Sequence, residues 1–308
     1  MKNYHENPCN LWLKIKHAWE LTRLEHGLMY GFGVLIGIVI AGGSSYEPAI
    51  FGFFTALFIQ AGTFALNDYC DLESDIANRR IDRPLVRGQL RKEEALLIAC
   101  LATTLGIISA IVLSVIMENL ILFLLALALA VLGILYDVKI KKILAVSNFY
   151  IAFTMAVPFI YGGLIAEPGE PEMVLLILIL SSIAFLAGFG REVMKDIADV
   201  KGDALRDVRS IARVYGVNKA KDITVFSYSL AVILSAVPFF LVNTSYFFSL
   251  AYLLPVMAAD VLFVHTCIKL KSFRKRFDSF DINYNYLRKE TLIALGIGLI
   301  AFVSGTLV

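Results

Sequence analysis

The sequence predicts an all-α membrane protein with nine transmembrane helices, arranged as two similar sets of four helices and one additional helix. Three observations predict this fold: the composition, the spacing of long apolar segments, and the distribution of basic residues. Of the 308 residues, 58% are hydrophobic and 18% are charged, and the mean hydropathy is +0.74. A soluble domain of ordinary composition is excluded by these values.

The apolar segments have the length that a membrane-spanning helix needs. A helix that crosses a hydrocarbon layer of ~30 Å requires roughly 20 mostly apolar residues, because its backbone polar groups must be satisfied within the segment. Nine segments meet this requirement: 22–42, 48–68, 94–116, 119–136, 146–166, 172–193, 221–242, 246–268 and 290–308. We expect a single transmembrane domain over residues 1–308.

The N-terminal segment, residues 1–20, has the pattern of a helix that lies at the membrane surface. Trp12, Ile15 and Trp19 recur at helical spacing, with Lys14 and Lys16 between them. Aromatic and basic residues in this pattern are typical of the headgroup region. We therefore expect an interfacial amphipathic helix before the first span.

The basic residues indicate the orientation in the membrane. The connections after the first, third, fifth and seventh segments contain no lysine or arginine. All 28 basic residues lie in the N-terminal segment, in the other connections or at nearby helix ends. By the positive-inside rule these regions are cytoplasmic. The N-terminus is then inside the cell, and nine crossings place the C-terminus outside.

An acidic stripe follows the second apolar segment. Asp68, Asp71 and Asp75 are spaced i, i+3 and i+7, so that on a helix they share one face. Magnesium is held in proteins by one or two carboxylates together with substrate phosphates. The stripe is therefore a candidate site for a metal–diphosphate complex; the alternative is a set of solvated charges where a helix leaves the membrane.

A second acidic stripe repeats this spacing after the sixth segment, in Asp196, Asp199 and Asp203. The two stripes are 128 residues apart, and each follows the second helix of a four-helix set. This indicates an internal duplication, with repeats at roughly 21–140 and 141–270. If the repeats pack with pseudosymmetry, the stripes face each other and hold two metal ions around one diphosphate.

Basic and polar residues at the same membrane level are candidate substrate ligands. Arginine matches phosphate oxygens with two hydrogen bonds, although cytoplasmic loops contain arginine in any case. The candidates near the stripes are Asn67, Arg79, Arg80, Arg83, Tyr136, Lys139 and Lys195. Arg23, at the start of the first span, either lines the cavity or anchors the helix at the interface.

With these residues considered together, the chain resembles the UbiA superfamily of intramembrane prenyltransferases over essentially its whole length. The resemblance is carried by Asn67-Asp68-x-x-Asp71-x-x-x-Asp75, Arg79-Arg80-Ile81-Asp82-Arg83-Pro84-Leu85, the Tyr136/Lys139 loop, and the stripe from Asp196 to Asp203. The stretch from Arg191 to Asp199 is also similar to the archaeal branch that makes digeranylgeranylglyceryl phosphate.

The resemblance implies a helical bundle around a central cavity and two aspartate-rich motifs that bind Mg²⁺ and a prenyl diphosphate. It implies catalytic roles for Asp71, Asp75, Asp199 and Asp203, with Asp68 and Asp196 as supporting metal ligands. Two Mg²⁺ ions are expected. The metal ions would assist departure of diphosphate, leaving an allylic cation that a lipophilic acceptor attacks.

Several alternatives stay open at this point. The acceptor is either an aromatic quinone precursor, a porphyrin-type ring or geranylgeranylglyceryl phosphate, and the prenyl length and oligomeric state are undetermined. Nothing indicates a nucleic acid partner. The competing function is a cation-coupled transporter, because carboxylates in membrane proteins often mark ion paths. Transporter sites, however, usually lie near the midplane at broken helices.

Overall fold

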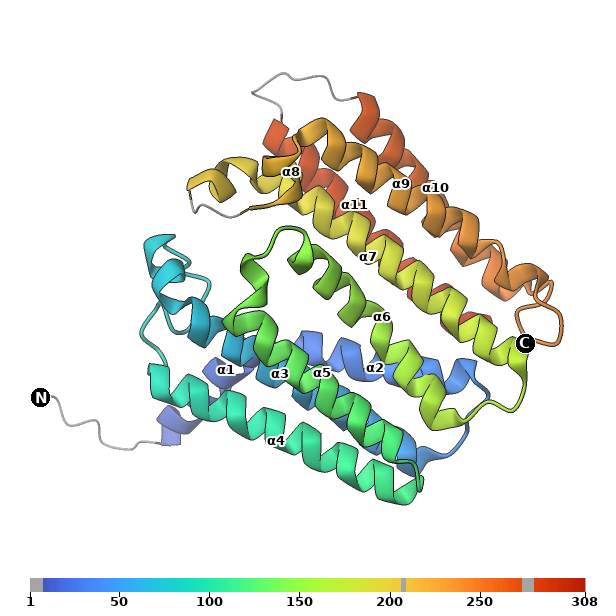
Figure 1. Ribbon diagram of the computed structural model, residues 1–308, viewed down its shortest axis with the longest axis horizontal. Helices are drawn as coiled ribbons and strands as arrows, with labels where there is room; N and C mark the ends of the chain where they lie inside the picture. The colour runs from blue at the N-terminus through green and yellow to red at the C-terminus, as the bar shows by residue number, and fades with distance from the viewer. Residues whose placement is uncertain (1–7, 206–208, 273–279, 308) are drawn as a thin grey trace, which may run out of the picture. The chain divides into compact units, whose positions relative to one another are not determined.

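The chain is helical throughout the part that the structure describes. The computed structural model describes the backbone of residues 8–205, 209–272 and 280–307. Within these ranges, the side chains of residues 8–11, 142, 199, 201–205, 280–283 and 285 are not described. The described backbone forms eleven α-helices and two short 3₁₀ helices and no strand (Figure 1). The prediction of an all-α fold is confirmed.

Seven of the described helices are long and apolar enough to cross a membrane. The number becomes eight if the bent pair Trp12–Thr22 and Leu24–Ile40 forms one span. The last predicted span, 290–308, lies in a helix that is not among them. This helix has only the residues from Thr291 to Ser304 after its charged Arg288-Lys289-Glu290 segment, or about 21 Å at 1.5 Å per residue. The protein is an integral membrane protein, and the count of nine stays a prediction.

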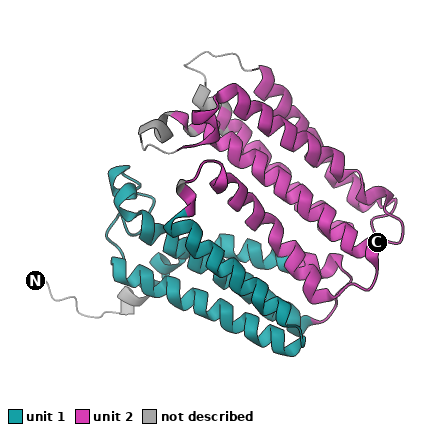
Figure 2. Ribbon diagram, viewed as in Figure 1, with its two compact units in different colours: residues 1–34, 46–139 teal, residues 35–45, 140–308 magenta. Residues whose placement is uncertain are grey.

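The chain forms two compact units (Figure 2). The first contains residues 1–34 and 46–139, and the second contains residues 35–45 and 140–308. The first unit contains α1 (Pro8–Thr22), the beginning of α2 (Leu24–Ile40), α3 (Tyr46–Ala77), α4 (Lys92–Ile116) and α5 (Leu120–Val138).

In the first unit, α3 is the central helix because α1, α4 and α5 all pack against it. Its largest contact is with α4, where small residues such as Ala65 and Ala99 let the two helices approach closely. Leu85 and Leu90, from the loop between α3 and α4, join the same buried cluster. The loop is therefore fixed at the end of α3 that carries the first stripe.

The second unit contains the end of α2 and the remaining helices. These are η1 (Ile140–Lys142), α6 (Val146–Ala166), α7 (Pro171–Leu205), α8 (Ile211–Val214), α9 (Val217–Ser235), η2 (Pro238–Phe240), α10 (Leu250–Ser272) and α11 (Phe280–Ser304). Here α7 is the central helix, in contact with α6, α8, α9 and α11. Val193, Met194 and Ile197 of α7 are fully buried in a cluster that also contains Ile211 of α8.

Two differences from the predicted helices bear on the site. The helices α3 and α7 continue beyond the predicted spans 48–68 and 172–193, so that both acidic stripes are helical over their whole length. The chain bends by 57° between Trp12–Thr22 of α1 and Leu24–Ile40 of α2, where the predicted interfacial helix meets the predicted first span. The bend occurs at Arg23, whose φ of 43° lies in the left-handed region.

Candidate functional site

The first stripe lies on the last three turns of α3, and its first carboxylate is paired within the protein. The side chain of Asp68 is 1% exposed. Arg23 donates to Asp68 Oδ1 over 2.6 Å, and Nη1 of Arg83 lies 3.2 Å from the same oxygen. A buried carboxylate needs such partners because burial of an unpaired charge is costly. Asp68 is thus compensated by two arginines.

The two arginines come from different elements and are themselves held in place. The guanidinium of Arg23 lies 4.7 Å from the centre of the Phe64 ring, an attractive cation–π contact. Nε of Arg83 lies 3.5 Å from Asp82 and 4.0 Å from Asp75. Arg83 therefore links the loop to both the first and the last carboxylate of the stripe.

Asp71 and Asp75 are the two stripe residues that remain partly accessible, and both are half-buried. The side chain of Asp75 is 14% exposed. No three His, Cys, Asp or Glu side chains among the described residues are arranged as a metal-binding group. Mg²⁺ does not require three, since one or two carboxylates and substrate phosphates satisfy it. The accessible pair therefore fits a metal that arrives with a diphosphate.

Asn67 makes a contact that the sequence analysis did not find. Its Nδ2 donates to Asp137 Oδ1 over 2.8 Å, and Asp137 on α5 is 1% exposed. The hydrogen bond joins the stripe of α3 to the end of α5, close in sequence to Tyr136 and Lys139. Tyr136 is half-buried and Lys139, the C-cap of α5, is exposed. The only sequence signal for Asp137 is an acidic residue at the end of an apolar span.

The loop arginines differ in their surroundings. Arg80 donates two hydrogen bonds to Asp82, over 3.0 and 2.9 Å. The pKa of Asp82 is lowered from its ordinary value because its carboxylate accepts these bonds. Arg79 is exposed and has a φ of 52°, which ends α3. In this arrangement Arg80 and Arg83 are held by carboxylates, whereas Arg79 faces solvent.

The second stripe lies on the last turns of α7. Asn148 of α6 donates to Asp196 Oδ2 over 3.0 Å. Lys195, next to Asp196, makes hydrogen bonds of 2.7 and 3.0 Å with Glu192, which sequence reasoning had not assigned. Asp199 and Asp203 belong to α7, but their side chains lie outside the described residues.

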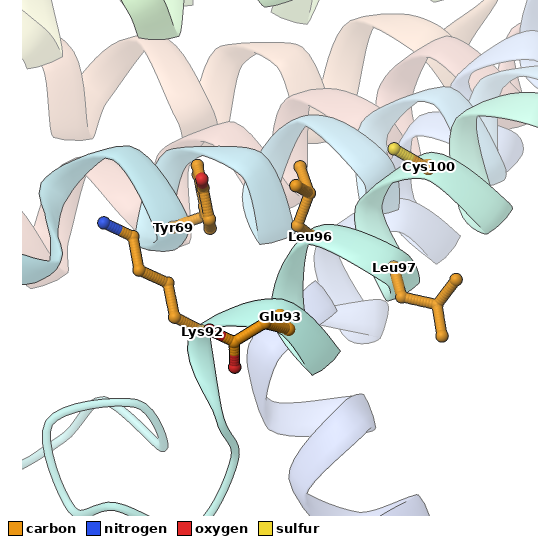
Figure 3. Close-up of a pocket in the computed structure, with 6 residues that line it drawn as sticks. All are labelled: Tyr69, Lys92, Glu93, Leu96, Leu97 and Cys100. Carbon is orange, nitrogen blue, oxygen red and sulfur yellow. The ribbon is translucent and has the colours of Figure 1, made fainter.

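A pocket of about 370 Å³ lies elsewhere on the first unit, between α3 and α4 (Figure 3). Its lining residues are Tyr69, Lys92, Glu93, Leu96, Leu97 and Cys100. Tyr69 follows Asp68 by one residue and so points about 100° away from it around α3. The pocket therefore opens on a different face from the stripe.

The described architecture is that of an integral membrane protein with a polar site at one end of a long central helix. The chain belongs to the UbiA prenyltransferase family, whose model matches residues 30–287. It is therefore an enzyme that transfers prenyl groups. The alternative of a cation-coupled transporter is not supported.

Individual relatives match almost the whole chain. A digeranylgeranylglyceryl phosphate synthase of Archaeoglobus fulgidus is 44% identical over 293 residues, covering 94% of this chain and 95% of that protein. A protein of the same name from Methanosphaera stadtmanae is 30% identical and covers 94% of this chain and 98% of its own length.

Solved structures give the same fold. A structure described as that of digeranylgeranylglyceryl phosphate synthase in membranes has a TM-score of 0.76 and 28% identity, covering 95% of this chain and 98% of its own. A UbiA homolog of Archaeoglobus fulgidus, solved with GPP and Mg²⁺, has a TM-score of 0.64 and 17% identity, covering 93% and 99%. This second likeness concerns the fold alone.

Proposed function

We propose that this enzyme transfers a geranylgeranyl group from its diphosphate to geranylgeranylglyceryl phosphate, releasing diphosphate. The observation that carries the proposal is the high identity, along almost the whole chain, to a relative with the corresponding name. An aromatic or porphyrin-type acceptor has no comparable support. The Arg191 to Asp199 stretch, which is similar to the archaeal branch, agrees with this choice of acceptor.

The proposed metal ligands are divided between the two stripes. Asp71 and Asp75 would hold one Mg²⁺ in the first unit, and Asp199 and Asp203 would hold a second. The use of Mg²⁺ is supported by the UbiA homolog solved with GPP and this ion. Asp68 and Asp196 accept hydrogen bonds from protein donors. We propose that these two residues hold the stripes in position through those hydrogen bonds, in addition to any contact with metal.

The proposed diphosphate ligands surround the stripes. Asn67, Arg79, Arg80, Arg83, Tyr136 and Lys139 belong to the first unit. Lys195 belongs to the second unit and is proposed as a substrate ligand without assignment to the donor. Arg79 has the strongest support as a direct ligand, because it is exposed at the end of the stripe helix. Arg23 and Arg83 form ion pairs with Asp68, so the negative charge of the first turn of the stripe is already compensated before substrate binds.

In the proposed reaction, the bond between C1 of the prenyl group and the diphosphate oxygen breaks, and its electron pair leaves with diphosphate. Arginine and the bound metal would stabilise this leaving group electrostatically. The acceptor hydroxyl oxygen then forms an ether bond to C1 and loses its proton. The base is either a stripe carboxylate or the departing diphosphate. Exclusion of water protects the allylic cation from hydrolysis.

The proposed duplication is supported by a local correspondence within each unit. In the first, Arg23, which precedes α2, donates to Asp68, and in the second, Asn148 near the start of α6 donates to Asp196. Both α2 and α6 begin after a residue with positive φ, Arg23 at 43° and Ala145 at 63°. The first carboxylate of each stripe is thus held from the start of the preceding helix. The divide between the units, at 139–140, adjoins the predicted repeat boundary.

The proposed orientation places the N-terminus and both stripes in the cytoplasm, with nine spans and the C-terminus outside. The distribution of basic residues supports this orientation. Single cysteines introduced at Glu118 and Arg209, in a cysteine-free background, test it with a membrane-impermeant thiol reagent on intact cells. Labelling of position 118 and not of 209 is expected, and the reverse pattern would exclude the orientation.

The test of the reaction is diphosphate release by purified protein in nanodiscs. Geranylgeranyl diphosphate is supplied with Mg²⁺ and, in turn, with geranylgeranylglyceryl phosphate or an aromatic acid acceptor. We expect release that depends on Mg²⁺, is abolished by a chelator and is stimulated by the glyceryl phosphate. Stimulation by the aromatic acceptor alone would overturn the proposed acceptor while retaining prenyl transfer.

A further inference from the structure

Three charged residues that lie within about 100° of one another around α7 are not explained by the acidic stripes. Arg191, Glu192 and Lys195 lie before Asp196, inside the candidate membrane span Pro171–Ala198. A charged side chain within a span is costly and is usually retained for a function. The cluster, defined as these three residues, therefore needs an explanation of its own.

The geometry of the cluster leaves positive charge on its accessible side. Lys195 Nζ lies 2.7 Å from Glu192 Oε2, and Arg191 Nη1 lies 3.6 Å from Glu192 Oε1. The side chain of Glu192 is 8% exposed, compared with 20% for Arg191 and 31% for Lys195. Two cations thus share one buried carboxylate. Nε of Arg191 is buried and has no hydrogen-bond partner among the described groups.

The first stripe has no equivalent of this cluster. A shift of 128 residues, which aligns the two stripes, places Thr63, Phe64 and Asn67 at the corresponding positions. The Thr63 hydroxyl donates to a backbone carbonyl of its own helix, that of Ile59, over 3.0 Å. The Phe64 ring contacts the guanidinium of Arg23, and Asn67 donates a hydrogen bond to Asp137, as described above. The stripes share one spacing, but a charged layer one turn deeper accompanies the second alone.

The position of the cluster suits a ligand beside the stripe. At about 100° per residue, Glu192 falls in line with Asp196, whereas Lys195 and Arg191 lie to one side, at about 60° and 100° from Glu192. An anion held by the two cations would therefore lie next to the carboxylates and any metal bound to them. The cluster is also deeper in the membrane than the stripe, where a lipid substrate enters more readily than a soluble anion.

A glyceryl phosphate acceptor brings such an anion. On a three-carbon glycerol, the hydroxyl that attacks lies within two carbons of the phosphate ester. When this hydroxyl reaches C1 of the donor, the acceptor phosphate comes close to the donor diphosphate, and the two anions repel each other. Cations beside the stripe would offset this repulsion, and the arginine fork matches phosphate oxygens.

We propose that Arg191 and Lys195 bind the phosphate of the acceptor lipid and that Glu192 is a positioning residue that holds the two cations. The proposal rests on the proposed function, because it assumes a glyceryl phosphate acceptor. Under this proposal, residues of the second unit select an acceptor that carries a phosphate. The same phosphate chemistry is present in the donor, so the experiment must separate the two sources.

The experiment combines one substitution with one change in the acceptor. Wild type and Arg191→Gln are each assayed with geranylgeranylglyceryl phosphate and with geranylgeranylglycerol, which lacks the phosphate. In wild type, loss of the phosphate should lower kcat/KM by about 10- to 100-fold, as expected for charge-assisted hydrogen bonds. In Arg191→Gln the two acceptors should differ by less than about 3-fold, and KM for the donor should be unchanged.

Controls separate this proposal from the proposed function and from folding. Lys219→Gln removes an exposed charge from α9 of the same unit and should retain full discrimination. Lys195→Gln gives a second test if Arg191→Gln does not fold, and Arg191→Lys should recover part of the discrimination. Equal phosphate dependence in wild type and both glutamine variants would overturn the inference, as would a raised KM for the donor alone. Failure of wild type to use any glyceryl acceptor would instead overturn the proposed function.

Discussion

Arg23 donates to Asp68 over 2.6 Å, so the residue at which α1 bends into α2 also neutralises the first carboxylate of the stripe on α3. The two residues are 45 positions apart in the sequence. Arg23 was a candidate substrate ligand by its place at the start of a span. In the folded protein Arg23 pairs with the buried Asp68, and this structural role does not depend on substrate.

Arg23→Ala should destabilise the protein by about 1–3 kcal/mol, because it leaves the buried Asp68 with Arg83 as its remaining arginine. Thermal unfolding in detergent measures the effect. Asp68→Asn in the same chain should restore part of the lost stability, since the charge that Arg23 compensates is then gone. Strictly additive losses in the double variant would show that the pair is not coupled.

Asp71→Ala and Asp199→Ala should each abolish turnover while leaving a folded protein, because each removes a proposed metal ligand. The measurement is Mg²⁺-dependent diphosphate release, with the unfolding temperature as the control for folding. Near-normal activity of the purified double variant would exclude the model with two acidic stripes.

Asn67→Ala should lower stability by about 1 kcal/mol, because the buried Asp137 loses a donor in a part of the protein with little access to water. It should also raise the KM for the prenyl diphosphate if Asn67 contacts that substrate. Asn119→Ala, which removes an exposed N-cap hydrogen bond of α5, is the matched control and should leave KM unchanged. A KM equal to that of wild type would remove Asn67 from the candidate ligands.

Gly37→Ala should disturb the contact between α2 and α6. A Cβ at this position would lie 2.3 Å from the Phe159 carbonyl oxygen, and a backbone atom cannot rotate away. We expect a loss of about 1–3 kcal/mol, typical of an overpacked contact, measured by thermal unfolding. Gly296→Ala on α11 is the control, because a Cβ there meets nothing within 4 Å. Equal stability of the two variants would contradict the close approach of α2 and α6.

The sequence predicted the helical fold, the membrane location and the family, because apolar length and charge placement are local properties that can be counted. Helix ends were less well predicted. The second span was expected to end at residue 68, yet α3 runs to Ala77. The window of apolar residues ends where the charges begin, so it marks the end of the span and not the end of the helix; the helical continuation is indicated instead by the i, i+3, i+7 spacing of the stripe. The predicted span 221–242 likewise did not show the break between the end of α9 at Ser235 and the start of η2 at Pro238.

The partners of the site residues could not be predicted in this way. Asn67 and Asp137 are 70 positions apart, and the periodicity of residues within one helix does not indicate which residues of another helix they contact. Glu192 could have been found, since it precedes Asp196 by four residues and so extends the second stripe along the same face. It was overlooked because it lies inside an apolar segment, where its cost in the membrane is the informative signal.

The length of α3 has a consequence for the traffic of substrates. At 32 residues the helix is about 48 Å long, whereas the hydrocarbon layer is ~30 Å thick, so its acidic end extends into the aqueous boundary. Two solubility regimes thus meet along one helix. If the stripe holds the prenyl diphosphate as proposed, the hydrocarbon tail would stay dissolved in lipid while the ionic head is solvated. The diphosphate left after each turnover would then depart directly into water without crossing the hydrocarbon layer.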